Sequence, residues 1–295
     1  MSATARRLPH VSSRQLRNLR LLMRVLQAIN TGLAARVAFR LFLTPLRRRL
    51  DPSDAPDVAG ATLHHVDCRN GDRAQVYDWG TGERTAIIVH GWSSHAARFA
   101  PLARALVARG WRVLAFDAPG HGVSPGRVSS LPQFIAALDA IIEKLGPVHA
   151  LIGHSLGALA IAVRLGDASK PVPSTLQRVV LISMPSGAPY LLESFEAMLG
   201  IRAPTRERMR QLFLHRFARE PSHYVSLPNA ARIPLPTLIV HDRNDDIVPL
   251  AHSEPLIAQM PRAQLHCTDG MGHSGLLRNP AGIQAIADFL GASFE

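Results

Sequence analysis

Acidic residues are absent from the first fifty positions of this 295-residue chain, although the whole chain carries 22 Asp and Glu against 33 Lys and Arg. Those fifty positions hold eleven arginines, so the rest of the chain carries 22 basic and 22 acidic side chains. The formal net charge of +11 therefore belongs to one segment. Because a nucleic-acid-binding protein spreads basic charge over a folded surface, this distribution argues against a nucleic-acid partner.

Cysteine is scarce as well. Cys68 and Cys267 are the two cysteines of the chain, and neither has the spacing of a metal ligand or of a disulfide scaffold. No phosphate loop, metal motif or dinucleotide fingerprint is found, so neither a cofactor nor a metal is expected. A hydrophobic content of 47% with 19% charged residues argues against disorder and fits a globular chain with a sizeable core.

The arginine-rich leader, residues 1–50, contains two stretches with helical periodicity. Residues 14–30 separate an apolar face from a polar one, formed respectively by Leu16, Leu19, Met23 and Leu26 and by Arg17, Arg20, Arg24 and Gln27. Residues 33–43 follow, with arginines one turn apart, and Pro45 ends the pattern. A membrane span needs about 20 predominantly apolar residues, and the arginines interrupt both stretches too often for that.

Three interpretations of the leader stay open. It is a helical extension packed on the domain, a helix that contacts an anionic membrane surface through residues 14–44, or an organelle transit peptide. A secretory signal fits poorly, because Arg24 splits the one candidate apolar core. A cytoplasmic protein, with or without peripheral contact to a membrane, is therefore expected. Residues 51–61, rich in Pro and Asp, are predicted to be a linker.

From residue 62 to residue 295, short β-rich runs alternate with helical patterns. The predicted strands are Leu63–Cys68, Ala74–Trp79, Thr85–His90, Arg112–Phe116, Ala150–Gly153, Val179–Ser183, Leu238–His241 and Ala263–Cys267. The predicted helices are 95–109, 131–145, 155–166, 250–259 and 279–291. Continuously apolar strands that alternate with helices predict an α/β fold: an eight-stranded, mostly parallel sheet covered by helices on both faces.

One interval breaks this alternation. Residues 184–233 contain no strand pattern but two helical stretches rich in Leu, Met and Phe. An insertion of this length at the carboxyl edge of a parallel sheet predicts a helical cap after the sixth strand.

The sequence Gly-His-Ser-Leu-Gly, residues 153–157, follows the fifth predicted strand. In a nucleophile elbow, the serine occupies a sharp strand-to-helix turn and the flanking glycines let neighbouring backbone pass. The strand before this motif and the helix after it satisfy that context. Ser155 is therefore predicted to be a nucleophile, in an elbow formed with Gly153, His154 and Gly157.

A serine nucleophile needs a base, which in turn needs an orienting acid, and in this architecture the acid precedes the histidine in the chain. The segment after the seventh strand offers Asp242, Asp245 and Asp246 as the acid. His273 lies in a loop after the last strand, bracketed by small residues. It is a better candidate base than three histidines that fall in helical patterns, His215, His223 and His252.

Acyl transfer also needs backbone N–H groups aimed at the developing oxyanion. Leu156, directly after the nucleophile, offers one such group, and Trp92, after the third strand, offers the second because Gly91 lets the chain turn back. Asp117 follows the fourth strand and precedes the serine, which is the wrong order for the acid. We interpret it as part of the hydrogen-bonded turn that includes Gly120 and Gly122.

Five ordered motifs together resemble the α/β-hydrolase superfamily: residues 87–92 (IIVHGW), 117–124 (DAPGHGVS), 153–157 (GHSLG), 245–249 (DDIVP) and 271–274 (MGHS). The resemblance covers roughly residues 62–295 and implies Ser155 as nucleophile, Asp245 as triad acid and His273 as base. It also implies that residues 184–233 are the cap. Asp242 stands where the family commonly has glycine, which leaves Asp242 or Asp246 as a minor alternative for the acid.

The superfamily includes esterases, lipases, thioesterases, carbon–carbon hydrolases, perhydrolases and acyltransferases, and the fold alone does not choose among them. The sequence favours a serine hydrolase that cleaves a small ester with an apolar, short-to-medium acyl chain through an acyl-enzyme. Acyl transfer or thioester hydrolysis on the same triad is one alternative. A non-catalytic, membrane-associated ligand-binding module is another. The family's strand order would also place the two cysteines near opposite edges of the sheet, as free thiols.

Overall fold

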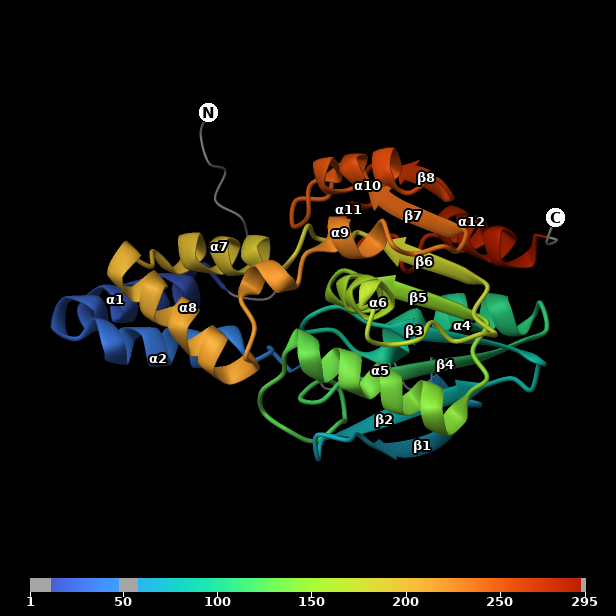
Figure 1. The fold of residues 1–295 in the computed structure, drawn as a ribbon, viewed down its shortest axis with the longest axis horizontal. Coiled ribbons are helices and arrows are strands. Elements are labelled where there is room, and N and C mark those ends of the chain that lie inside the picture. The colour runs from blue at the N-terminus through green and yellow to red at the C-terminus, as the bar shows by residue number, and fades with distance from the viewer. Residues whose placement is uncertain (1–11, 48–57, 293–295) are drawn as a thin grey trace.

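The computed structural model describes residues 12–47 and 58–292, and within them lies one eight-stranded sheet (Figure 1). Its strands are β1 Thr62–Asp67, β2 Arg73–Trp79, β3 Arg84–Val89, β4 Trp111–Asp117, β5 Ala150–His154, β6 Arg178–Ile182, β7 Thr237–Asp242 and β8 Ala263–Thr268. Their spatial order is β1-β2-β4-β3-β5-β6-β7-β8, with β2 antiparallel to both neighbours and the other pairs parallel. The predicted α/β fold with eight strands is confirmed.

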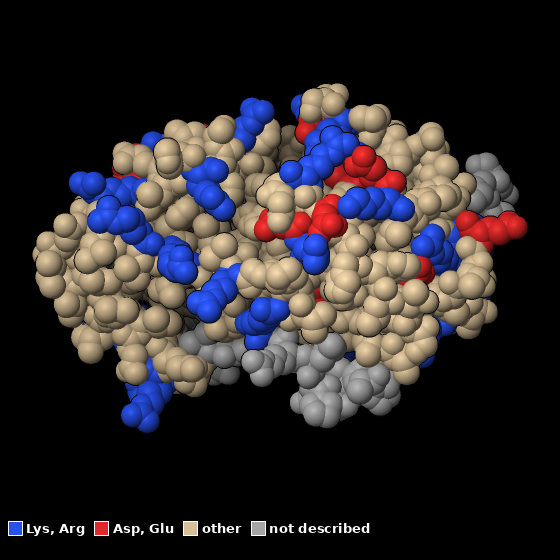
Figure 2. Space-filling view, turned by 90° about the horizontal axis from the view of Figure 1, so that it is seen from below, with Lys and Arg blue, Asp and Glu red and all other residues tan. Residues whose placement is uncertain are grey.

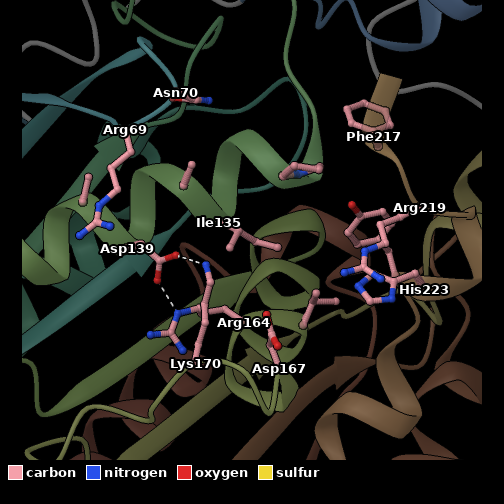
Figure 3. A pocket seen from close by; sticks show the side chains of 15 residues that line it. Arg69, Asn70, Ile135, Asp139, Arg164, Asp167, Lys170, Phe217, Arg219 and His223 are labelled. Atoms are coloured by element: carbon pink, nitrogen blue, oxygen red, sulfur yellow. Dashed lines mark hydrogen bonds and ion pairs between the residues drawn. The ribbon is translucent and has the colours of Figure 1, made fainter. Parts of the chain in front are cut away.

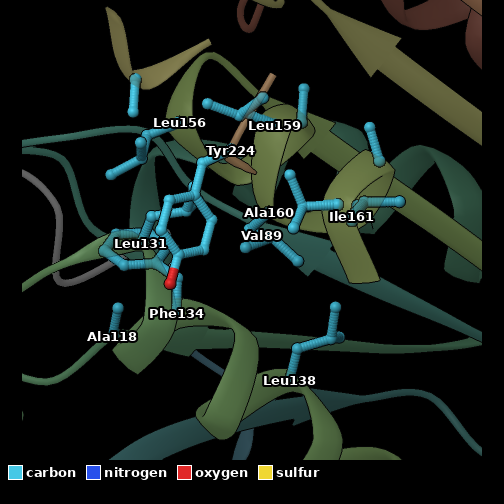
Figure 4. Close-up of a cluster of buried hydrophobic side chains, with 14 of the residues drawn as sticks. Val89, Ala118, Leu131, Phe134, Leu138, Leu156, Leu159, Ala160, Ile161 and Tyr224 are labelled. Carbon is cyan, nitrogen blue, oxygen red and sulfur yellow. The ribbon is translucent and has the colours of Figure 1, made fainter. Parts of the chain in front are cut away.

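Helices cover both faces of this sheet. They are η2 Ala96–Phe99, α4 Ala100–Val107, α5 Leu131–Leu145, α6 Leu156–Gly166, η4 Leu250–His252, α10 Glu254–Gln259, α11 Gly272–Gly275 and α12 Pro280–Gly291. Consecutive residues of β3 enter different cores: Ile87 lies with α5 and α6 on one face, and Ile88 lies with α4 and α12 on the other. Figure 4 shows the first core, where Val89 from β3 and Phe134 from α5 are drawn with residues of α6. Strands buried on both faces explain the continuously apolar runs in the sequence.

The two cysteines lie at opposite ends of the strand order. Cys68 directly follows β1 at one edge of the sheet, and Cys267 belongs to β8 at the other. Both are free thiols, as predicted.

The interval between β6 and β7 is helical. It contains α7 Ala188–Leu199, α8 Ala203–Phe217, η3 Pro221–His223 and α9 Ser226–Ala230. Gly187 at the start of this interval forms an isolated bridge with Val225 near its end. Gly187 and Val225 therefore lie side by side, and residues 184–233 are called the lid below.

The leader forms two helices, α1 Ser13–Ile29 and α2 Thr31–Phe42, that pack against α7 and α8 (Figure 1). Asn30 both ends α1 and caps α2, with its side chain accepting a hydrogen bond from the N–H of Leu33. The rings of Phe39 and Phe213 meet edge to face at 6.4 Å between centroids, and those of Phe42 and Phe195 at 5.3 Å. Leader and lid therefore share one apolar core and form a single helical layer.

The apolar face predicted for residues 14–30 is the face that packs. Met23 is fully buried, and Leu16, Leu19 and Leu26 are partly buried against the same core. No helix within the described parts of the chain is both long and apolar enough to cross a membrane. Of the predicted linker, residues 51–57 lie outside the described residues.

Candidate active site

Ser155 stands between β5 and α6 in a strained backbone conformation. Its φ of 53° and ψ of −117° are unusual for a residue with a side chain. A Cβ atom on Gly153 would lie 2.6 Å from the backbone of Ala158, and one on Gly157 would lie 2.2 Å from the carbonyl oxygen of Val89. Both positions accept glycine alone without rearrangement, so the local geometry is that of the nucleophile elbow expected from the motif.

His273 and Asp245 form a hydrogen-bonded pair. The Nδ1 atom of His273, in α11, lies 2.8 Å from Oδ2 of Asp245, in the loop after β7. The other oxygen of Asp245 accepts hydrogen bonds from the N–H groups of Ile247 and Val248, at 3.0 and 2.8 Å. Burial raises the pKa of Asp245, but the hydrogen bond and charge of His273 and the two N–H donors outweigh it, so the pKa is lowered. The carboxylate is thus ionised near neutral pH and acts only as an acceptor.

Ser155 and the His273 loop are joined through the residue that precedes the serine. Nε2 of His154 lies 2.8 Å from the carbonyl oxygen of His273, and the two imidazole rings are 4.8 Å apart between centroids. Burial holds the pKa of His154 well below its ordinary value, so the ring is neutral and its Nε2–H donates. Gly91 also packs closely against the serine, because a Cβ atom at position 91 would lie 3.0 Å from Cβ of Ser155.

The sequence assigned His154 to the elbow only. Its hydrogen bond to His273 joins residues 119 positions apart and has a backbone oxygen as acceptor. Every residue has such an oxygen, so the sequence could not predict this bond.

Asp242 holds the loop that carries His273 and is not bonded to the imidazole. Its two oxygens accept four hydrogen bonds, from the side chain of Thr268 at 2.6 Å and from the N–H groups of Asn244, Met271 and Gly272 at 3.0, 3.0 and 2.9 Å. Burial raises the pKa of Asp242, but these bonds lower it on balance. Asp246 is exposed to solvent. Among the three aspartates that the sequence proposed for the acid, Asp245 is the one in contact with His273.

Two backbone N–H groups are candidates for an oxyanion hole. Leu156 is the first residue of α6, where an N–H has no acceptor within the helix. Trp92 lies in a turn closed by a 3.3 Å hydrogen bond from the N–H of Ser94 to the carbonyl of Gly91. The Ser93 hydroxyl in that turn accepts a 2.9 Å hydrogen bond from the N–H of Leu46, so the leader contacts the predicted oxyanion turn directly.

Asp117 has the architectural role predicted for it. Its carboxylate accepts hydrogen bonds from the N–H groups of Ala96 at 2.7 Å and Val123 at 2.9 Å. A Cβ on Gly122, whose φ is +46°, would lie 2.0 Å from that carboxylate. The glycine lets the loop close over the aspartate, as the sequence analysis supposed.

His90 connects the ends of β3 and β4 as a neutral, fully buried imidazole. Its Nδ1–H donates to the carbonyl of Gly91 at 2.7 Å, and its Nε2 accepts from the N–H of Ala118 at 3.0 Å. Burial lowers the pKa of His90 from its ordinary 6.5 to about 4. The unfolded chain therefore binds more protons between these values, and stability falls as pH drops from about 6.5 towards 4.

At pH 5 this one group is expected to reduce the unfolding free energy by about 2 kcal/mol relative to neutral pH. Urea denaturation at pH 7 and pH 5 measures the loss. The variant His90→Gln should show a smaller difference between the two pH values, whereas His215→Gln, at an exposed site, should leave it unchanged. An equal difference in the wild type and His90→Gln would contradict the assignment.

A separate hollow of about 500 Å³ lies between α5, the loop after α6 and the end of α8 (Figure 3). On one wall Asp139 accepts from both Arg164 and Lys170, and on another lie Arg219 and His223 from the lid. None of the residues predicted for the catalytic centre lines this hollow. His223 is one of its lining residues, and Nδ1 of His252 accepts a hydrogen bond from the N–H of Ser186.

A comparison of the sequence with models of known families identifies the family of this chain. The family model described as the alpha/beta hydrolase family matches residues 86–285, which include the elbow, the three aspartates and His273. This chain is an alpha/beta hydrolase. The match agrees with the strand order and with the elbow geometry at Ser155.

Two curated relatives of this alpha/beta hydrolase are named as hydrolases. A 2-hydroxy-6-oxononadienedioate/2-hydroxy-6-oxononatrienedioate hydrolase of Cupriavidus pinatubonensis is 26% identical over 78% of this chain and 96% of its own length. A 2-hydroxy-6-oxo-6-phenylhexa-2,4-dienoate hydrolase of Burkholderia cepacia is 28% identical over 68% of this chain and 85% of its own length.

Solved structures similar to this alpha/beta hydrolase share its fold. The esterase Pf2001 of Pyrococcus furiosus aligns with a TM-score of 0.62 and 16% identity, covering 84% of this chain and 96% of the esterase. A meta-cleavage product hydrolase of Pseudomonas fluorescens aligns with a TM-score of 0.55 and 19% identity, covering 77% of this chain and 96% of that protein.

Proposed function

We propose that this alpha/beta hydrolase is a serine hydrolase that cleaves a small carboxylic ester through an acyl-enzyme. The observation that carries the proposal is the convergence of three features: the strained Ser155, the His273–Asp245 pair at 2.8 Å, and the His154 bond that ties them together. A serine hydroxyl is a weak nucleophile unless a positioned base removes its proton, and the imidazole of His273 is such a base.

In the proposed reaction, Oγ of Ser155 attacks the ester carbonyl while its proton passes to Nε2 of His273. The negative charge that forms on the carbonyl oxygen is stabilised by the N–H groups of Leu156 and Trp92. The intermediate collapses when the carbon–oxygen bond of the alcohol breaks, and His273 returns the proton to the departing oxygen. Water then attacks the acyl-enzyme, gives its proton to His273, and releases the acid and a free Ser155 hydroxyl.

Asp245 acts in this scheme by fixing the imidazole. Its Oδ2 accepts the Nδ1–H of His273, which leaves Nε2 unprotonated and able to accept the proton of the serine. Because its other oxygen is held by two backbone N–H groups, the carboxylate cannot turn away from the ring. The positive charge that appears on His273 during the reaction is stabilised by this fixed carboxylate.

The apolar composition of the lid supports an ester with an apolar acyl chain. Several of its large side chains are buried in the core shared with the leader, among them Leu192, Met198, Leu199, Met209 and Phe213. Leu191 is only partly buried, and it is the lid side chain that we assign to the edge of an acyl pocket.

The relatives make carbon–carbon bond hydrolysis a second candidate. The names of two relatives describe 2-hydroxy-6-oxo dienoates, which present a ketone carbonyl to a nucleophile in place of an ester carbonyl. The same triad would serve for attack on that ketone. Transfer of the acyl group to an alcohol or thiol instead of water is a third outcome of the same chemistry.

A fluorophosphonate probe tests the shared part of these candidates, because it phosphonylates a serine only where a base activates it. We expect stoichiometric labelling of the purified wild type, with the modified peptide containing residue 155, and no labelling of Ser155→Ala. Absence of labelling in folded wild-type protein would support a non-catalytic module and contradict the proposal.

Substrate panels separate the candidates. p-Nitrophenyl acetate, butyrate and octanoate are compared with 2-hydroxy-6-oxo-6-phenylhexa-2,4-dienoate, each with wild type and Ser155→Ala. We expect Ser155-dependent turnover of the esters, fastest for a short or medium chain. Turnover of the dienoate alone would replace ester hydrolysis with carbon–carbon cleavage. Ester products formed with an added alcohol would indicate acyl transfer.

A further inference from the structure

Helix α1 exposes a second apolar stripe on the side opposite to its packed face. Four aliphatic side chains form this stripe, with exposed fractions of 62% for Leu21, 44% for Leu22, 48% for Val25 and 75% for Ile29. At 3.6 residues per turn, Leu21, Val25 and Ile29 lie on the reverse side of the helix from the buried Met23, and Leu22 lies at the edge of that side. The described residues show eleven exposed large apolar side chains, and six of them fall within residues 12–47. The concentration on so short a segment marks an interaction surface.

Arg17 and Arg24 flank this stripe along one side of α1, and the described N-terminal segment carries no acidic residue. Arg14, Arg17 and Arg24 of α1 are exposed, as are Arg36 and Arg40 of α2, and residues 12–47 include no Asp or Glu. Arg20 differs, because its Nε donates to the carbonyl of Met198 and so belongs to the packed face. In the view of Figure 2, the helical end of the molecule carries mostly basic side chains, whereas acidic ones gather over the sheet. This surface of α1 thus carries an apolar stripe with positive charge along one side of it.

We infer that the stripe of α1, formed by Leu21, Leu22, Val25 and Ile29, docks on an anionic lipid bilayer. Exposed aliphatic side chains flanked by arginines match the boundary between acyl chains and negatively charged headgroups. The apolar face predicted from the sequence cannot serve this purpose, since it is buried against the lid. The docking itself does not depend on the proposed function, whereas its consequence for ester access rests on that function.

A second copy of the chain fits the stripe poorly. Two α1 stripes placed face to face would bring the arginines of one copy against those of the other, and residues 12–47 offer no carboxylate to pair with them. Like charges brought together across an interface weaken it. Anionic headgroups supply the complementary charge at every position around the helix.

The position of α1 on the lid gives the docking a consequence for substrate access. Because α1 packs against α7, a bilayer bound to α1 lies beside the lid. Amphiphilic esters dissolved in that bilayer would then be concentrated near the helical layer that borders the active site.

Co-sedimentation of the full-length protein with vesicles tests the inference. We expect binding to phosphatidylcholine vesicles that contain phosphatidylglycerol, little binding to pure phosphatidylcholine, and weaker binding as salt is raised. The variant Leu21→Gln/Leu22→Gln/Val25→Gln/Ile29→Gln keeps helix-forming residues and should bind about tenfold or more weakly. Arg17→Gln/Arg24→Gln should weaken binding by roughly fivefold per arginine.

A matched control replaces exposed leucines elsewhere. Leu63→Gln/Leu265→Gln removes apolar side chains that are 59% and 37% exposed on the outer strands and should bind vesicles as the wild type does. Thermal melting of each variant verifies that it is folded. The inference is wrong if the wild type ignores anionic vesicles or if the stripe variant binds them unchanged. It is also wrong if the stripe variant instead abolishes a dimer seen by light scattering, because a second copy would then cover the stripe.

Discussion

Asp245→Asn is expected to lower kcat for p-nitrophenyl ester hydrolysis about 10⁴-fold while leaving the fold intact. An asparagine side chain can present its amide N–H₂ to Nδ1 of His273, which then carries no proton there and must carry it on Nε2. The imidazole would face Ser155 as a donor and could not remove the hydroxyl proton. The loss should appear in kcat, because ground-state binding of a small ester does not involve Asp245.

Two neighbouring aspartates provide matched controls for this prediction. Asp246→Asn changes an exposed carboxylate and should leave kcat within about twofold, as surface changes usually do. Asp242→Asn removes the charge that holds the His273 loop through four hydrogen bonds, and it should reduce thermal stability more than Asp245→Asn does. If a well-folded Asp242→Asn lost 10⁴-fold in kcat while Asp245→Asn stayed active, Asp242 would be the acid.

Phe39→Ala is expected to destabilise the protein by about 3 kcal/mol, although residue 39 lies in the leader. The ring of Phe39 meets those of Phe213 and Phe217, each at 6.4 Å between centroids, in the core between α2 and α8. Removing it leaves a cavity that two lid side chains line. Chemical denaturation measures the loss, and the midpoint should fall without a change in slope if unfolding stays cooperative.

Leu33→Ala is the control on the same helix, since its side chain is 41% exposed and should cost at most about 0.5 kcal/mol. Equal stability of Phe39→Ala and Leu33→Ala would mean that the leader does not share the lid's core. The same packing also predicts the effect of removing residues 1–45. Their removal uncovers the lid core, so we expect the truncated protein to lose both stability and activity.

Strand and helix positions were largely predictable, because strands buried on both faces must be continuously apolar. The helix predicted at 131–145 is observed at Leu131–Leu145, and the short runs before and after it became β4 and β5. The alternation alone therefore specified a parallel sheet. The helix predicted at 95–109 is shorter as an α-helix, since Ala96–Phe99 forms a 3₁₀ turn before α4 begins.

The partnership of leader and lid was not predictable from local pattern. The helical periodicity places Arg20 and Gln27 on the polar face of residues 14–30. In the structure, their side chains donate to the carbonyls of Met198 and Gly200 at the end of α7. Gln27 also accepts from the N–H of Arg202. The sequence does not show whether a polar side chain is solvated or donates to the free carbonyl groups at the end of another helix.

The candidate site was predictable where residue type and chemistry coincide, as at Ser155 and His273. The choice of Asp245 among three aspartates rested on a resemblance, because all three follow the same strand. Backbone hydrogen bonds separate them in the structure: Asp242 receives four donors around the His273 loop, and Asp245 is the one aimed at the imidazole.

The bond between Arg20 and Met198 joins residues 178 positions apart, which has a consequence during synthesis. At the speed of a ribosome, roughly ten to thirty seconds separate the emergence of α1 from that of α7. Through that interval α1 exposes both its packed face and its apolar stripe. The arginines of α1 and α2 have no partner in the lid during that time. A nascent chain in this state is expected to bind chaperones, and the lid covers the packed face of α1 only when translation is two-thirds complete.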